Sequence, residues 1–148
     1  MDELDPAHHI FRHIPKTKMQ GGVIDSSAFW LRMDKVTGRF IDDGLSVNWA
    51  EYFQKATPQE AIAPLRHMLE TKKNKRTIGG ESKFALLNVR AVKEAAAKYV
   101  PVTVVLDEEE GDPSHSLVNG YEAFNEEVAE EILKIVIAAC HPPPRAGS

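Results

Sequence analysis

Carboxylates and an imidazole gather in one short segment, residues 107–115, and side chains of these types can exchange protons or bind a divalent cation. The segment reads DEEEGDPSH, so Asp112 and His115 lie three residues apart in a stretch rich in turn-forming residues. A turn here would bring the two side chains close together. We therefore take Asp112 and His115 as candidate catalytic residues, with Asp107 or Glu110 as an accompanying carboxylate.

The same segment has a plainer interpretation as a solvated acidic loop. Neighbouring carboxylates repel one another, and such side chains often simply face water. The spacing does not match an EF-hand loop, which needs Asp or Asn at alternating positions, a central Gly and a final Glu. We assign no metal ligand, and the sequence leaves any cofactor unknown.

A basic run follows the expected helix in the middle of the chain and precedes the glycine-containing loop 77–82. Its four cations, which we take as candidate phosphate- or nucleic-acid-binding residues, are Lys72, Lys73, Lys75 and Arg76. No GKS or GKT completes a phosphate-binding P-loop. The alternative is that these cations only complement the negative end of a helix dipole.

Serine nucleophiles are available but carry no local signature. Neither GxSxG nor SxxK occurs, and the serines considered are Ser26, Ser27, Ser46, Ser114 and Ser116. A catalytic triad is recognised by geometry and not by sequence neighbours. The single cysteine, Cys140, ends an apolar stretch and is predicted to be a small buried side chain.

The elements that must position the acidic loop begin with the apolar, β-branched run 102–106, which predicts a buried strand. Functional loops often follow such rigid elements. Before it, residues 84–89 predict a strand and 90–99 a helix. The three together suggest a parallel βαβ crossover, and an antiparallel arrangement remains open because the connection is short.

Further strands are expected at 10–14, where apolar and polar residues alternate, and at 45–49. A helix is predicted to begin at Thr57, where Glu60 completes a capping box, and to kink or restart at Pro64. The last helix is expected over 121–139, since apolar residues recur there every three or four positions.

The whole chain of 148 residues is long enough for one domain, and its net charge of −4 argues against coating nucleic acid through its overall field. We predict one α+β domain over 1–140, a small mixed sheet with the C-terminal amphipathic helix on one face. Residues 141–148 are predicted to form a disordered tail. One cysteine, no signal peptide and no membrane-spanning run predict a cytoplasmic protein.

Three functions are compatible with these features. The leading hypothesis is a non-enzymatic binding module that acts through a protein partner, because the basic run 72–76 and the acidic segment 107–112 segregate charge. The first alternative is a small hydrolase or nuclease-like enzyme that uses the loop 107–115. The second is phosphate or nucleic-acid binding through the basic run. Self-association is possible, and no membrane partner is expected.

Overall fold

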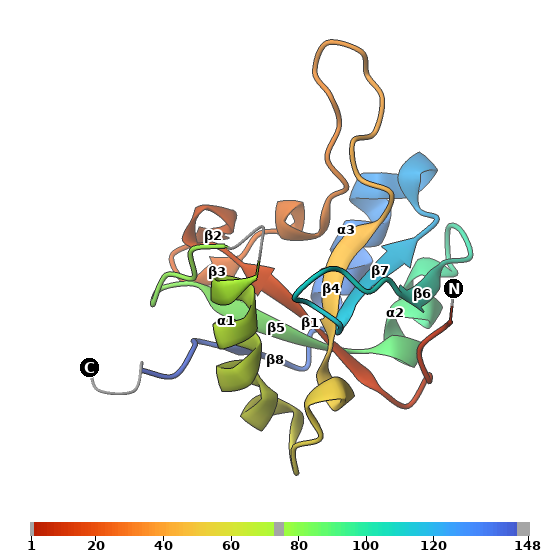
Figure 1. Cartoon of the computed structure of the whole chain (residues 1–148). Coiled ribbons are helices and arrows are strands. Elements are labelled where there is room, and N and C mark those ends of the chain that lie inside the picture. Colours follow the sequence, from red (N-terminus) through yellow and green to blue (C-terminus); the bar gives the residue numbers. More distant parts are fainter. Residues whose placement is uncertain (1, 73–75, 145–148) are drawn as a thin grey trace.

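A six-stranded sheet forms the centre of the computed structural model, which describes residues 2–72 and 76–144 (Figure 1). Its strands, in chain order, are β1 (His9–Ile14), β4 (Leu45–Trp49), β5 (Lys83–Asn88), β6 (Thr103–Leu106), β7 (His115–Asn119) and β8 (Ala138–Cys140). Their spatial order is β6-β7-β4-β1-β5-β8, and each neighbouring pair is antiparallel. The predicted α+β class is confirmed, with an antiparallel sheet where a mixed one was expected.

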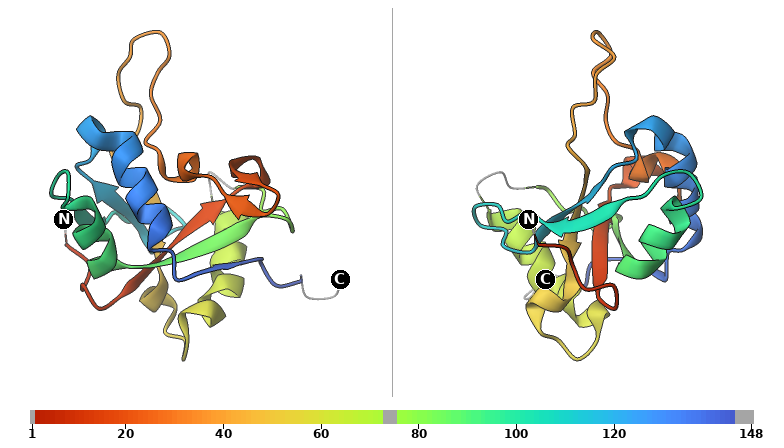
Figure 2. Two further views of the ribbon diagram at one scale, coloured as in Figure 1. Left: turned by 180° about the vertical axis from the view of Figure 1, so that it is seen from behind. Right: turned by 90° about the vertical axis from the view of Figure 1, so that its right-hand side faces the viewer.

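Helices cover both faces of this sheet. Figure 2 shows α1 (Ile62–Thr71) on one side and α2 (Val89–Ala96) with α3 (Asn125–Lys134) on the other. The larger buried cluster lies under α2 and α3, and a smaller one lies under α1. The loop between β6 and β7 lies on the α1 side, so helix and loop together cover that face (Figure 2).

The alternation of β1 explains how one strand serves both clusters. Ile10 and Ile14 belong to the larger cluster and Phe11 to the smaller one. Side chains two residues apart share a face of a strand, so Arg12 points the same way as Ile10 and Ile14. Arg12 therefore lies on the face of β1 where the alternating pattern predicts an apolar core residue.

The helix predicted from Thr57 forms in two parts. The capping box of Thr57 and Glu60 starts a 3-10 helix, η4 (Pro58–Ala61), and α1 follows directly. In a continuous α-helix from Pro58, the N–H of residue 64 would donate to the Glu60 carbonyl oxygen. Pro64 has no N–H, and the turn before it is a 3-10 turn and not an α-helical one. The predicted restart and the end near residue 72 are confirmed.

Two predicted elements need correction. The last helix is shorter than expected: the 3-10 turn η5 (Glu122–Phe124) precedes α3, and the chain leaves α3 after Lys134 to add β8 to the sheet. Cys140 therefore lies on a strand and not at the end of a helix. The strands β5 and β6 are not neighbours, since β1, β4 and β7 separate them, so no adjacent βαβ pair forms.

A second, two-stranded sheet joins β2 (Met19–Gln20) to β3 (Val23–Ile24). Gly21 and Gly22 have φ of 58° and 81°, which suits the tight hairpin turn between them. Next, the 3-10 helix η2 (Ser26–Phe29) packs against α3. Leu31 still belongs to the core, and the chain from there to β4 extends away from the body as an arm, residues 32–43 (Figure 1). Two further 3-10 segments are η1 (Lys16–Lys18) and η3 (Ala50–Phe53).

The C-terminal segment lies against the body up to residue 144. His141 Nδ1 is 3.0 Å from the Ser82 carbonyl oxygen, and Arg66 donates to the Pro143 carbonyl oxygen at 2.8 Å. Residues 145–148 lie outside the described residues, so the domain boundary at 140 and the disordered tail stay predictions. Among the described helices, none combines the length and apolarity that crossing a bilayer requires.

Candidate functional site

The acidic loop is folded back on itself between β6 and β7. The Asp107 amide donates to the His115 carbonyl oxygen at 2.8 Å, and Glu109 and Asp112 form an isolated bridge further out. Gly111, with φ of 76°, supplies the left-handed turn between them. The loop therefore holds its side chains in fixed positions against the α1 side of the sheet.

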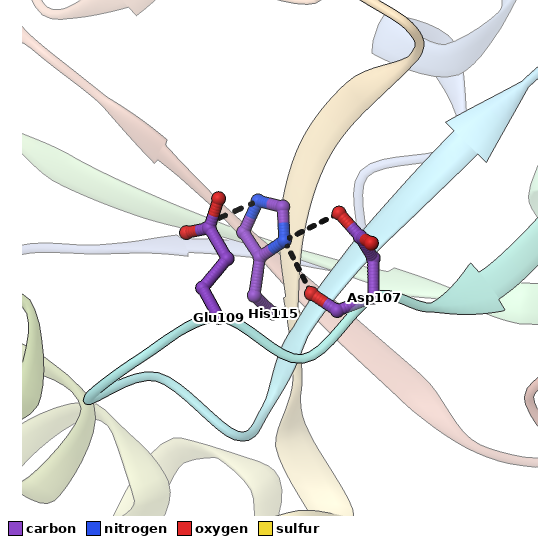
Figure 3. Close-up of side chains that lie close together, drawn as sticks. All are labelled: Asp107, Glu109 and His115. Atoms are coloured by element: carbon purple, nitrogen blue, oxygen red, sulfur yellow. Dashed lines mark hydrogen bonds and ion pairs between the residues drawn. The ribbon is translucent and has the colours of Figure 1, made fainter.

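His115 is the buried centre of this loop, with a side chain only 5% exposed. Its Nδ1 lies 2.9 Å from the Asp107 carbonyl oxygen and 3.3 Å from the Asp107 carboxylate (Figure 3). The backbone carbonyl oxygen can only accept a hydrogen bond, so Nδ1 must carry the proton. In the neutral ring this leaves Nε2 with its lone pair, as a general base requires.

That free lone pair is directed at a serine. Ser46 Oγ lies 3.2 Å from His115 Nε2, and the hydroxyl can donate to it. The sheet creates this pair: Asn48 is opposite His115 in the β4–β7 ladder, and Ser46 is one side chain along on the same face. Ser46, His115 and Asp107 thus lie in the order hydroxyl, imidazole and carboxylate, which is the order of a nucleophile, a base and an orienting group in a catalytic triad.

Glu109 approaches the imidazole from the other side, with its Oε1 atom 3.9 Å from Nε2 (Figure 3). Asp107, Glu109 and His115 are close enough together to hold a metal ion. The Lys72 ammonium group, however, already lies 3.2 Å from the same Glu109 oxygen. A dication bound there would have a positive charge as its immediate neighbour, so the arrangement favours proton transfer over metal binding.

Lys72 also joins a buried polar network beneath the loop. Its Nζ atom lies 2.9 Å from the Asp112 carboxylate, which is fully buried. Asn48 donates to the other Asp112 oxygen at 2.9 Å, and Ser114 Oγ donates to it at 3.2 Å. Every oxygen of this buried carboxylate therefore has a partner, and the network fixes the loop to the end of α1.

A cavity of about 320 Å³ lies beside the triad, where two strands separate. β1 pairs with β4 at only two positions, Ile10 with Trp49 and Phe11 with Asn48, whereas it pairs with β5 along its whole length. Beyond Phe11 the Arg12 side chain bridges the opening. Its Nε donates to the Ala28 carbonyl oxygen at 3.1 Å, and its Nη1 donates to the Ser46 carbonyl oxygen at 2.9 Å.

Half of the polar side chains around this cavity are arginines. The lining residues are Arg12, His13, Pro15, Arg32, Asp42, Leu45, Ser46 and Arg76. Arg32 is neutralised by Asp42, at 2.8 Å. Within residues 2–72 and 76–144, neither Arg12 nor Arg76 forms an ion pair, and the buried His13 Nε2 atom has no hydrogen-bond partner.

The titration behaviour of these groups reflects the crowding of positive charge. Burial, with the nearby Arg76 charge, lowers the pKa of the Arg12 guanidinium to about 10, so it stays charged at neutral pH. Burial and the same two arginines lower the pKa of His13 to about 4, which keeps its ring neutral. The cavity thus presents positive charge that no carboxylate balances fully.

The structure brings together some of the predicted site residues and separates others. His115 lies at the centre of the site and Arg76 lines the adjacent cavity. Asp112 contacts Lys72 rather than the imidazole among the described side chains, so its catalytic role stays a prediction. Lys72 is buried against carboxylates, and Lys73 and Lys75 lie outside the described residues.

Sequence reasoning did not single out Ser46, Arg12 or Arg32. Ser46 lies 69 residues from His115, and only the β4–β7 ladder joins them. One clue was present for Arg12, which breaks the apolar face of the alternating strand 10–14. A cation at a core-facing strand position is costly unless it is paired or used.

Comparison with known proteins adds no family to this description. The chain matches no protein-family model, and no curated protein or solved structure shows significant similarity to it. Any functional assignment therefore depends on the site itself.

Proposed function

We propose that this protein is a hydrolase that cleaves an ester by nucleophilic attack of Ser46. The observation that carries the proposal is the series of contacts through His115: its Nε2 meets Ser46 Oγ, and its Nδ1 is hydrogen-bonded to the Asp107 carbonyl oxygen and lies 3.3 Å from the Asp107 carboxylate. It supports the first alternative raised by the sequence, with Ser46 added and Asp107 as the orienting carboxylate. The cytoplasmic location stays part of the proposal.

The chemistry follows from the protonation state of the imidazole. As Ser46 Oγ attacks the ester carbonyl carbon, its proton passes to His115 Nε2, and Asp107 stabilises the imidazolium that forms. The alcohol leaves as the tetrahedral intermediate collapses and takes that proton. Water then attacks the acyl-serine, with the same nitrogen as base, and releases a carboxylic acid and free Ser46.

Arg12 has a positioning role in this scheme. Its guanidinium holds the Ser46 carbonyl oxygen, so it fixes the backbone of the nucleophile where β4 leaves β1. A serine held in one orientation loses less entropy on reaching the transition state. The cavity beside Ser46 gives a substrate a route to a histidine that is otherwise almost inaccessible to solvent.

A fluorophosphonate probe tests the nucleophile, because it phosphonylates an activated serine and a weakly nucleophilic one hardly at all. We expect one adduct, located at Ser46 by peptide mass spectrometry and absent from Ser46→Ala. Asp107→Asn should slow labelling at least about 100-fold, in the range by which a positioned base contributes. Addition of EDTA should not change the rate.

Two substitutions serve as matched controls. Ser26→Ala removes another serine, and Glu108→Gln neutralises an exposed carboxylate next to Asp107. Both should label like the wild type. Equal labelling of Ser46→Ala and wild type, or no labelling of either, would refute the hydrolase. A labelling rate that EDTA abolishes would assign the cluster to metal chemistry instead.

The protein-partner hypothesis finds support on a different surface from the one expected. Lys72 is bound to Glu109 and Asp112, so the two charged segments partly neutralise each other inside the molecule. The arm 32–43, in contrast, exposes three apolar side chains: Met33 by 47%, Val36 by 95% and Ile41 by 57%. Exposed apolar groups on a projecting element suit contact with another protein.

We infer from the arm a second function, binding of a protein partner through an apolar surface. An identified partner, found by photo-crosslinking from position 36, should bind the purified chain. Val36→Glu should weaken that binding at least tenfold, while Lys35→Glu, an exposed neighbour on the same turn, should leave it within twofold. Equal weakening by both variants would indicate a general charge effect and contradict an apolar contact at Val36.

A further inference from the structure

The opening between β1 and β4 is lined, among the described residues, by more cationic than anionic side chains. Arg12, Arg32 and Arg76 line it, and Asp42 is the carboxylate among its lining residues. The three guanidinium groups and this carboxylate leave two net positive charges around a cavity of about 320 Å³. Arg12 and Arg76 are half-buried there, and partly enclosed charges are normally paired, so a cavity of this kind favours an anion.

The available donors indicate which anion fits. The Arg12 guanidinium uses Nε and Nη1 on backbone carbonyl oxygens, and no described contact occupies its Nη2 atom. Arg76 is held in place by its backbone, which donates to the Leu69 carbonyl oxygen at 2.9 Å. Guanidinium groups from several directions match the oxygens of a phosphate, which accepts paired hydrogen bonds from arginine.

His13 supplies an independent observation. Its ring lies against Phe84, with centroids 5.2 Å apart, and its Nε2 atom is buried without a partner. An unsatisfied buried nitrogen is costly unless a ligand or ordered water meets it. A phosphate oxygen in the cavity would give this nitrogen a partner.

We propose that the cavity lined by Arg12, His13, Arg32 and Arg76 binds the phosphate group of a small phosphorylated molecule. A phosphate dianion balances the two net charges, and the cavity volume leaves room for a modest organic group beyond it. Because Ser46 lines the same cavity, a bound substrate would present its ester to the nucleophile. That last step rests on the proposed function, whereas phosphate binding does not.

Calorimetric titration with inorganic phosphate tests the site without any turnover. We expect binding by the wild type and at least tenfold weaker binding by Arg76→Met, a difference of about 1.4 kcal/mol. Arg76→Lys should be intermediate, since it keeps the charge and loses the paired donors. Arg39→Met is the control, because Arg39 is exposed on the arm, and it should bind like the wild type.

Two further measurements separate this proposal from the hydrolase. Ser46→Ala should still bind phosphate, and phosphate should protect Ser46 of the wild type from the fluorophosphonate probe. If Ser46 is labelled but phosphate does not bind, the phosphate site is refuted and the hydrolase stands. If acetate binds as tightly as phosphate, or Arg39→Met weakens binding as much as Arg76→Met, the site recognises charge in general and the proposal fails. Thermal unfolding without phosphate verifies that each variant is folded.

Discussion

Two cations lie four residues apart in this chain, and their surroundings differ: Lys72 is buried and Arg76 is half-buried. Lys72 lies between Asp112 and Glu109, and its side chain is 5% exposed. Arg76, four residues later, lines a cavity with Arg12 and has no ion-pair partner among the described residues. The first cation is fully neutralised inside the chain, and the second is not.

This difference between Lys72 and Arg76 distinguishes a charge that stabilises the fold from a charge that is available to a ligand. Burial costs an ion pair its hydration free energy. The attraction between the two charges and the surrounding hydrogen bonds offset that cost only in one geometry, so the pair fixes one arrangement of the chain. A half-buried cation such as Arg76, with no ion-pair partner among the described residues, gains no such stabilisation in the empty protein and gains it when an anion binds. Two cations of one sequence run therefore have different roles.

The largest expected effect comes from breaking the paired region. Lys72→Met leaves the Asp112 carboxylate buried without its cation, and we expect the free energy of unfolding to fall by about 3–5 kcal/mol. Urea denaturation measures this loss. The double variant Lys72→Met with Asp112→Asn should recover a large part of it, because the unpaired charge is gone.

The single variant Asp112→Asn also tests whether Asp112 is a catalytic residue, as the sequence predicts, or a structural one. A destabilised protein in which Ser46 still reacts with the probe would mean that Asp112 supports the loop. A stable protein in which Ser46 no longer reacts would instead assign Asp112 to catalysis, and would remove the contrast drawn above.

An intermediate effect is expected from pH in the unpaired region. The pKa of His13 is about 4 in the folded chain, lowered from 6.5 by burial and by Arg76 and Arg12, so the unfolded chain binds the proton more readily. Stability is fully present above pH 6.5 and falls as the pH is lowered toward 4, by about 2 kcal/mol from this residue.

The His13 contribution is isolated as a difference between variants. His13→Gln should flatten the dependence of the unfolding free energy on pH between 6.5 and 4, compared with the wild type. His67→Gln, which removes an exposed imidazole on α1, should not. Identical slopes for wild type and His13→Gln would mean that the ring is not crowded by the arginines.

The smallest effect is expected from Arg76→Met in the absence of phosphate. Removal of one of two facing cations relieves repulsion, so the free energy of unfolding should stay the same or rise, by up to about 1 kcal/mol. The matched comparison is Lys72→Met, the same loss of charge four residues earlier. If both variants lose several kcal/mol, Arg76 has a structural partner and the comparison between the two regions breaks down.

Local patterns predicted much of the fold. The capping box at Thr57 and Glu60 and the alternation over 10–14 act between near neighbours, so they can be recognised in the sequence alone. The last helix was overestimated because residues 135–139 are apolar enough to continue it. Pairing of β8 with β5 competes with that helix, and a periodic pattern contains no information about distant strands.

The sequence by itself determined several elements, including the strands at 10–14 and 45–49 and the helix after Thr57, as well as the loop 107–115 and the types of group that could do chemistry there. Tertiary structure alone decided that His115 meets Ser46 from another strand, and that Arg12 and Arg76 share a cavity while Lys72 is buried against carboxylates. The physical reason is the separation along the chain over which each interaction acts. Helix and strand propensity and helix capping depend on residues a few positions apart in the sequence. Proton transfer and charge pairing depend on atoms about 3 Å apart in space, which only the sheet register brings together.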